Sequence, residues 1–261
     1  MAVNATGAAY HRQDDVALVE LLCPVLDTRV KRELLAAVKQ AGDDGTARAV
    51  LITGSEKAFC VGQDLAEHAT ALTDGAETAF ATVRAHYNPL ITAIRALRVP
   101  VVAAVEGACV GAGLGLVLAA DLRVAAAGAT FATAFTGIGL AADSGLSAGL
   151  TQLAGPSRAA GLMLLGNRFT AAEAESWGLV HEVVPDGTAT EAGLATATRL
   201  AQGPTRAYRE VKTLLRDAQT SDPAQVLERE ADAQERLGAT HDHRTAVDAF
   251  LARRRPRFEG R

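Results

Sequence analysis

The stretch VEGACVGAGLGLVLAAD, residues 105–121, decides the fold type, because three glycines at 111, 113 and 115 join a strand-like run to a helix-like run. A dinucleotide fingerprint would need glycine where Leu116 stands, and an acidic residue about twenty positions further on, which is missing. A phosphate loop would need a following lysine, and none lies near. Two interpretations remain: the glycines allow close helix packing, or the free N–H groups of the first helical turn bind a developing anion.

Around this stretch, short strand-like runs alternate with longer segments of helical apolar spacing, which predicts an α/β core. The expected strands are 16–22, 48–54, 99–107, 122–128 and 181–185. After Pro185 the pattern becomes helical throughout, and the expected helices are 188–201, 203–218, 222–238 and 243–254. We therefore expect a core over 1–200 and a helical C-terminal subdomain over 201–261.

Composition narrows the class of protein. The 261 residues include 26 basic and 30 acidic side chains, a balance that disfavours nucleic acid as a partner. The N-terminal segment MAVNATGAAYHRQDD does not resemble a secretory signal, and no apolar run predicts a membrane span. Cys23, Cys60 and Cys109 have no metal-ligand spacing, so we expect free thiols in a reducing cytoplasm. No metal is expected, although His241 and His243 lie close together.

A second segment favours the anion-binding interpretation. ITGSEKAFCVGQDLAEH, residues 52–68, also runs from a strand into a glycine-containing loop. The two segments resemble the two oxyanion-hole motifs of the crotonase family, also called the enoyl-CoA hydratase/isomerase superfamily. Further ordered matches are FATAFTGIGLAADSG, LLGNRFTAAEAESWGLVHEVV and the ending VDAFLARRRPRFEGR. The resemblance covers nearly the whole chain from about residue 16, and several motifs in compatible order make it specific.

The resemblance implies a fold, a substrate and an assembly. The fold would be a ββα spiral core followed by a helical subdomain that mediates trimerisation, in a homotrimer or homohexamer. The substrate would be an acyl-CoA thioester, so that coenzyme A enters with the substrate and no separate cofactor is needed. The backbone N–H groups of Gln63 and Ala112 would hold the thioester oxygen as it becomes an enolate, where one donor is typically worth ~10²–10³ in rate.

The resemblance also implies residues that contact the substrate or its CoA part. Lys212 and Arg253 match basic positions of the C-terminal helices and would meet the CoA phosphates. The remaining expected contacts are Val61, Gly62, Asp64, Leu65, Gly111 and Phe135. Asp64 is also a candidate for fixing its own loop.

The acid–base residues decide the reaction. Hydratases of the family carry two glutamates, and these positions fall on Gly115 and Phe135 here. The segment IGLAADSG instead resembles the I-G-L-x-P-D-x-G-G of phenylacetate-pathway enoyl-CoA isomerases, although Ala142 and Leu146 depart from that pattern. Those enzymes use a single aspartate, which implies that Asp143 moves a proton between carbons of the acyl chain. Burial should raise the pKa of such an aspartate toward that of a useful base.

Other interpretations stay open at this point. Asp143 could cap the helix that follows it. It could be a nucleophile, as in 4-chlorobenzoyl-CoA dehalogenases, although Phe135 stands where those enzymes have a tryptophan. The chain could also be a hydratase that uses other acid–base groups, or an acyl-CoA-binding protein without catalysis.

Several further residues have structural explanations. Thr170 and Glu173 predict a capping box, and Gly178 predicts the end of the same helix. Trp177 is expected to be a packing anchor. Glu106 is expected to be structural.

Overall fold

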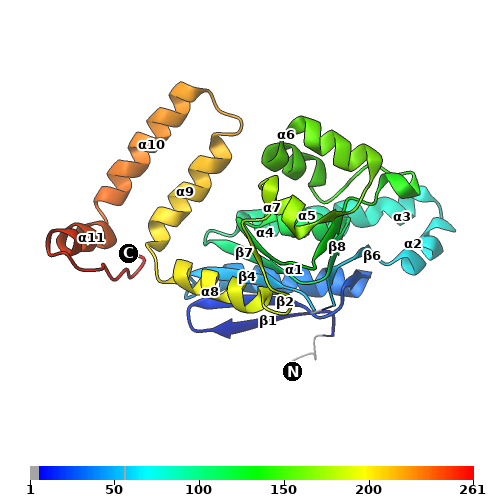
Figure 1. Cartoon of the computed structure of the whole chain (residues 1–261), viewed down its shortest axis with the longest axis horizontal. Coiled ribbons are helices and arrows are strands. Elements are labelled where there is room, and N and C mark those ends of the chain that lie inside the picture. The colour runs from blue at the N-terminus through cyan, green and yellow to red at the C-terminus, as the bar shows by residue number, and fades with distance from the viewer. Residues whose placement is uncertain (1–5, 56) are drawn as a thin grey trace.

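The computed structural model describes residues 6–55 and 57–261. The first five residues of the N-terminal segment, and Glu56 of the 52–68 segment, lie outside the described residues. Its main element is a six-stranded sheet in the spatial order β1-β2-β4-β7-β9-β12 (Figure 1). In that order the strands are Ala8–Gln13, Val16–Leu21, Ala49–Thr53, Val101–Val105, Leu122–Ala126 and Glu182–Val184. Strands β1 and β2 form an antiparallel pair, and the remaining neighbours are parallel.

Both faces of this sheet are covered, which explains why its central strands are continuous apolar runs. Along β7, Val101, Ala103 and Val105 belong to the larger core, whereas Val102 and Ala104 belong to a second, smaller core. The larger core contains residues of α1 (Thr28–Asp43), and the smaller contains residues of α8 (Ala189–Ala201). All five expected strands are confirmed, each slightly shorter than the predicted run.

A smaller sheet, in the order β11-β10-β8-β5, lies beside the first. Its strands are Phe169–Thr170, Thr130–Ala132, Ala108–Val110 and Ala58–Cys60, and a two-stranded parallel pair joins β3 (Val25–Leu26) to β6 (Gly62–Gln63). The chain passes from β4 to β5, from β7 to β8 and from β9 to β10, so that successive turns add one strand to each sheet. This is the expected ββα spiral.

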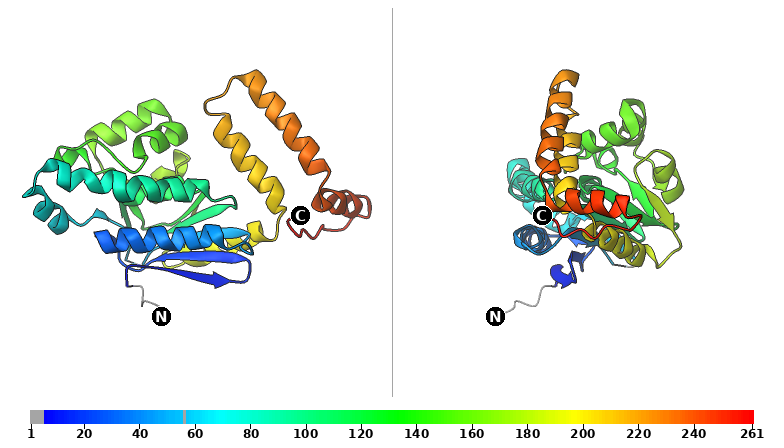
Figure 2. Two further views of the ribbon diagram at one scale, coloured as in Figure 1. Left: turned by 180° about the vertical axis from the view of Figure 1, so that it is seen from behind. Right: turned by 90° about the vertical axis from the view of Figure 1, so that its left-hand side faces the viewer.

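The other helices of the core lie above the main sheet and to its right in Figure 1, and Figure 2 shows them from two further sides. They are α2 Leu65–Leu72, α3 Ala76–Thr82, α4 Asn88–Ala96, α5 Ala112–Ala119, α6 Leu146–Leu165 and α7 Ala171–Ser176, with a 3₁₀ turn η2 at Thr136–Ile138. A π-helical turn, η1 (Val83–Tyr87), joins α3 to α4. Pro89 follows this turn and has no N–H to donate to the preceding turn, which favours the wider winding.

Three helices follow the core: α9 Thr205–Asp217, α10 Pro223–Gly238 and α11 His241–Leu251. In Figures 1 and 2, α9 and α10 run antiparallel beside the core. Lys212 connects α9 to the core by two hydrogen bonds: its Nζ lies 2.5 Å from Asp121 Oδ2 and 2.8 Å from the carbonyl oxygen of Val99. The expected boundary at 200/201 falls at the end of α8.

Local expectations about helix ends are confirmed. Thr170 and Glu173 form the capping box of α7, and Gly178 after that helix has a φ of 77°. Glu106 is buried and accepts hydrogen bonds from the N–H groups of Gly187 and Ala189, at the start of α8.

Within residues 6–55 and 57–261, no helix has the length and apolar character needed to cross a bilayer.

Candidate active site

The first side of the site is the loop between β5 and α2. Gly62 has a φ of 88°, a backbone conformation that side chains rarely adopt. Asp64 then caps α2, accepting hydrogen bonds from the N–H groups of Ala66 and Glu67 at 2.8 Å each. Gln63 is therefore held between a glycine turn and a capped helix.

The second side is the glycine-rich entry to α5. Gly111 has a φ of 58°, and Ala112 is the first residue of the helix, so its N–H has no intrahelical acceptor. A Cβ at Gly113 would lie 2.4 Å from the carbonyl oxygen of Cys60. Gly113 therefore permits close packing, and the positive φ of Gly111 turns the chain into α5. The anion-binding interpretation stays a prediction.

The structure brings these two segments together. A Cβ placed on Gly62 would lie 3.7 Å from the Ala112 nitrogen. Between them opens a cavity of about 440 Å³, and most of its lining is apolar. It is lined by Val25, Val61, Gly62, Gln63, Leu65, Tyr87, Val110, Gly111, Ala112, Thr133, Ala134, Phe135, Ile138 and Asp143.

Asp143 is the one carboxylate among these lining residues. Burial raises the pKa of Asp143, while a hydrogen bond from Ser144 Oγ, at 2.7 Å from Asp143 Oδ1, and the positive charge of Lys31 oppose that rise. Ser144 has a φ of 52° and Ala134 a φ of 62°, so the backbone departs from its usual conformations on both sides of the cavity. The capping interpretation of Asp143 is wrong, because Gly145 is the N-cap of α6 and no side chain caps that helix.

Gly115 explains how the segment carrying Asp143 approaches α5. A Cβ at Gly115 would lie 2.6 Å from the carbonyl oxygen and 2.7 Å from the Cβ of Ser144. A glutamate at this position has no room unless the Ser144 backbone moves. The second hydratase position, Phe135, is half-buried and contributes an aromatic ring to the cavity.

Two residues that the sequence did not single out lie under this site. The Lys31 side chain is completely buried, and its Nζ lies 3.0 Å from Gln63 Oε1. The Tyr87 hydroxyl donates to the same oxygen at 2.5 Å. The sequence feature that could have pointed to Lys31 is its position in the apolar stripe of α1, beside Val30, Leu34 and Val38.

The other predicted contacts are placed as follows. Val61 and Leu65, 39% and 60% exposed, supply apolar surface at the cavity. Asp64 is used as a helix cap and does not line the cavity. Lys212 and Arg253 also lie outside the lining; Lys212 is paired with Asp121, and Arg253 is exposed beyond the end of α11.

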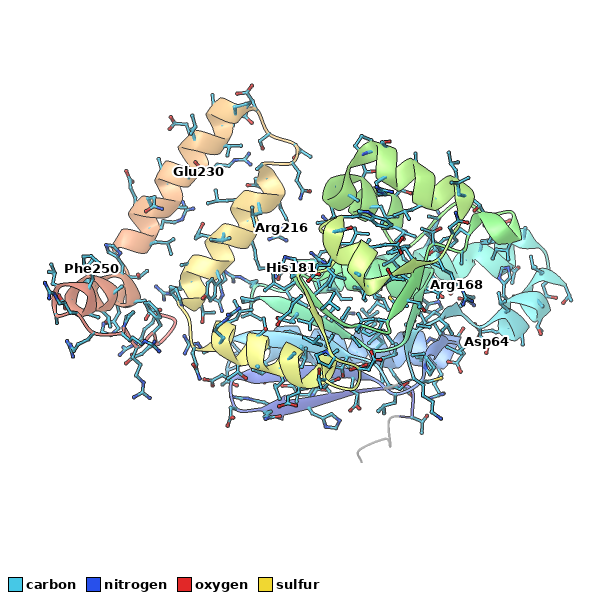
Figure 3. All side chains as sticks on the ribbon, viewed as in Figure 1. Asp64, Arg168, His181, Arg216, Glu230 and Phe250 are labelled. Carbon is cyan, nitrogen blue, oxygen red and sulfur yellow. The ribbon has the colours of Figure 1, made fainter. Side chains whose placement is uncertain are left out.

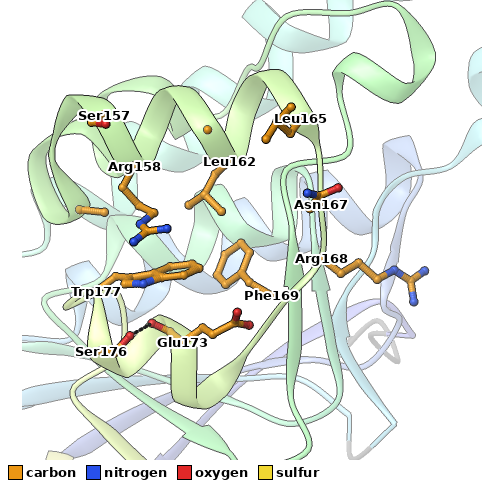
Figure 4. A pocket seen from close by; sticks show the side chains of 12 residues that line it. Ser157, Arg158, Leu162, Leu165, Asn167, Arg168, Phe169, Glu173, Ser176 and Trp177 are labelled. Atoms are coloured by element: carbon orange, nitrogen blue, oxygen red, sulfur yellow. Dashed lines mark hydrogen bonds between the residues drawn. The ribbon is translucent and has the colours of Figure 1, made fainter.

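A second, larger hollow of about 800 Å³ lies between α6 and α7 (Figure 4). Trp177 packs here, with the guanidinium of Arg158 4.3 Å from its ring centre and Phe169 at 5.4 Å. These contacts confirm Trp177 as a packing anchor.

Among the residues that the structure describes, no group of three or more His, Cys, Asp or Glu side chains is placed to hold a metal ion.

Chemically, the cavity combines three features. The Gln63 segment and the first turn of α5 meet at one cavity, and backbone N–H groups at such a place would suit a carbonyl oxygen that becomes negative. A single carboxylate with a raised pKa suits proton removal. The apolar lining suits an acyl group.

Comparisons with known proteins show the family of this chain. The enoyl-CoA hydratase/isomerase family model matches residues 11–261. The chain is 38% identical over 229 residues to the 1,2-epoxyphenylacetyl-CoA isomerase of Escherichia coli, covering 88% of this chain and 87% of that protein. It is 40% identical over 256 residues to a protein of Rhodobacter capsulatus named "Probable enoyl-CoA hydratase", covering 97% of each chain.

Solved structures agree with the fold. A crystal structure described as an enoyl-CoA hydratase/isomerase from Mycobacterium abscessus superposes with a TM-score of 0.95 at 53% identity, covering 97% of this chain and 100% of the other. This protein therefore belongs to the enoyl-CoA hydratase/isomerase family, the crotonase superfamily. It is an enzyme of that family by descent, and its relatives carry both isomerase and hydratase names.

Proposed function

We propose that this protein is an enoyl-CoA double-bond isomerase in which Asp143 carries the proton. The observation that carries the proposal is that Asp143 is the one carboxylate lining the cavity at the two N–H loops, with no room for a glutamate at Gly115. The relative named 1,2-epoxyphenylacetyl-CoA isomerase supports ring-derived acyl groups of the phenylacetyl-CoA type as candidate substrates.

In this mechanism the thioester oxygen accepts hydrogen bonds from the N–H groups of Gln63 and Ala112. Asp143, as the carboxylate, removes a proton from one carbon of the acyl chain, and the negative charge spreads onto the thioester oxygen. The same carboxyl group then returns the proton to another carbon, so the double bond moves and no other reactant is consumed. General acid–base catalysis of this kind typically contributes ~10²–10⁴ in rate.

The experiment gives the full-length protein a 3-enoyl-CoA and crotonyl-CoA in separate reactions. An isomerase forms the conjugated 2-enoyl product from the first and leaves the second unchanged. Rapid loss of the conjugated absorbance of crotonyl-CoA, with incorporation of water, would establish the hydratase alternative instead. Binding of both thioesters without turnover would favour the non-catalytic alternative.

We also propose that the chain assembles as a homotrimer or homohexamer in the cytoplasm, with Lys212 and Arg253 near the CoA phosphates. Exposed apolar side chains on the C-terminal helices support assembly: Val211, Leu215, Leu227, Val247, Phe250 and Leu251. The free thiols of Cys23, Cys60 and Cys109 suit a reducing compartment. The protein needs no separate cofactor, because coenzyme A arrives as part of the thioester substrate.

A further inference from the structure

A buried cation lies beneath the Gln63 loop. Lys31 Nζ lies 2.8 Å from Thr82 Oγ1, 3.0 Å from Gln63 Oε1 and 3.4 Å from Glu67 Oε1. An ammonium group has three protons to donate, and these acceptors come from three different segments of the chain. Burial lowers the pKa of Lys31, and the Glu67 carboxylate opposes this effect by favouring the charged form.

Two donors converge on one oxygen of Gln63. Besides Lys31, the Tyr87 hydroxyl donates to Gln63 Oε1 at 2.5 Å, and burial raises the pKa of Tyr87, which keeps the hydroxyl protonated. An ammonium group cannot accept a hydrogen bond, so rotating the amide would place its NH₂ group against the Lys31 protons. The oxygen end of the Gln63 amide is therefore fixed toward Lys31 and Tyr87.

The nitrogen end of the same amide faces elsewhere. Among the hydrogen bonds of the described residues, Gln63 Oε1 accepts two and Gln63 Nε2 donates none. Gln63 Nε2 is also not one of the fully buried side-chain atoms without a partner in this part of the chain. Gln63 lines both the main cavity and a smaller adjoining one of about 60 Å³, which Asp143 also lines.

We propose that the Gln63 side-chain NH₂ is a specificity-determining donor for a hydrogen-bond acceptor, an oxygen or an unprotonated nitrogen, on the acyl part of the thioester. Lys31 and Tyr87 are then positioning residues that hold the donor toward the cavity. The inference rests on the acyl-CoA function proposed above and specifies the substrate class. A site that donates a hydrogen bond to its substrate discriminates against an acyl group that has no acceptor for that hydrogen bond.

The test is Gln63→Glu in the full-length protein. This substitution keeps the backbone N–H and keeps an oxygen facing Lys31 and Tyr87, but it replaces the donor by an acceptor. The probes are phenylacetyl-CoA and its three pyridylacetyl-CoA isosteres, whose ring nitrogen only accepts when unprotonated. Calorimetry at about pH 8 gives the ratio of pyridyl to phenyl affinity, and Gln152→Glu, at an exposed glutamine, is the matched control.

We expect the ratio for at least one pyridyl isomer to fall by about tenfold in Gln63→Glu and to stay at the wild-type value in Gln152→Glu. An unchanged ratio for all three isomers, with wild type binding the probes, would overturn this inference alone. Failure of wild type to bind any of the four thioesters, while it still converts a 3-enoyl-CoA, would overturn this inference alone. Failure with the 3-enoyl-CoA as well would overturn the acyl-CoA function proposed above.

Lys31→Met tests the positioning role separately. Without the positive charge of Lys31 the Gln63 amide can rotate. We therefore expect the ratio of pyridyl to phenyl affinity to fall in Lys31→Met, as it does in Gln63→Glu. A folded Lys31→Met protein with the wild-type ratio would overturn the role of Lys31. The Gln63→Glu comparison still decides the donor role if Lys31→Met does not fold.

Discussion

At the scale of single residues, Asp143 is subject to opposing influences. Burial raises its pKa, whereas the Ser144 hydroxyl and the Lys31 charge favour the ionised form. A proton-removing base works only when deprotonated, so activity should fall as the pH drops through the raised pKa of Asp143. Ser144 is buried, has a left-handed backbone conformation and donates a hydrogen bond to this carboxylate.

Replacing Ser144 by alanine tests this balance. The variant loses the 2.7 Å hydrogen bond to the ionised Asp143, so the pKa of Asp143 should rise further. We expect the acid limb of the pH–rate profile for kcat/KM to move to higher pH. Ser157→Ala, at an exposed position, should leave the limb in place, and a limb that moves to lower pH in Ser144→Ala would contradict the account.

The sequence predicted some of these residues and not others. Gln63, Ala112 and Asp143 lie within motifs, and the structure brings all three to one cavity. Lys31 and Tyr87 could not be predicted, because their importance comes from contacts with Gln63, 32 and 24 positions away. Such contacts depend on how α1 and η1 pack. The place of Lys31 in the apolar stripe of α1 indicates that it is buried, but not what it contacts.

At the scale of elements, Gly115 decides how closely α5 approaches the segment carrying Asp143. Gly115→Ala would place its Cβ 2.6 Å from the Ser144 carbonyl oxygen. We expect the free energy of unfolding to fall by about 1–3 kcal/mol, and activity to fall because Ser144 and Asp143 must shift. Urea denaturation and steady-state kinetics measure the two effects.

The matched control is Gly161→Ala in α6. A Cβ there meets no atom within 4 Å, so the substitution should stabilise the helix by about 0.5–1 kcal/mol. Equal free energies of unfolding for Gly115→Ala and Gly161→Ala would contradict this prediction, because they would mean that Ser144 can move away from α5 at little cost.

The pair that fastens α9 to the core gives a second prediction. The Lys212 side chain is 10% exposed and that of Asp121 is 34% exposed, so water can solvate an unpaired Asp121 better than an unpaired Lys212. We expect Asp121→Asn to lower the free energy of unfolding by about 1–3 kcal/mol, and Lys212→Met to lower it less. Thermal unfolding of both variants ranks them, and the reverse order would contradict this explanation.

Elements were predicted better than their connections. Long apolar runs such as β4 and β7 are buried on both faces and so are visible in the sequence. The three-residue strands β5, β8 and β10 are too short to show a period.

At the scale of the whole molecule, the C-terminal helices present apolar side chains outward. Phe250 is 81% exposed at the end of α11, which lies far from the core in Figure 3. We expect Phe250→Asp to weaken the proposed assembly and to lower the mass measured by light scattering at micromolar protein. Lys39→Asp, on an exposed part of α1, is the control, and a monomeric wild type would contradict the proposal.

The role of Asp143 as the proton carrier is tested most directly by the exchange of the α-protons of a bound acyl-CoA with heavy water. NMR compares this exchange in wild type and Asp143→Asn. We expect Asp143→Asn to bind the thioester but to exchange its α-protons ~10²–10⁴ times more slowly, because the oxyanion donors remain and the base is gone. Exchange at the wild-type rate in Asp143→Asn would contradict the assignment of Asp143 as the group that carries the proton.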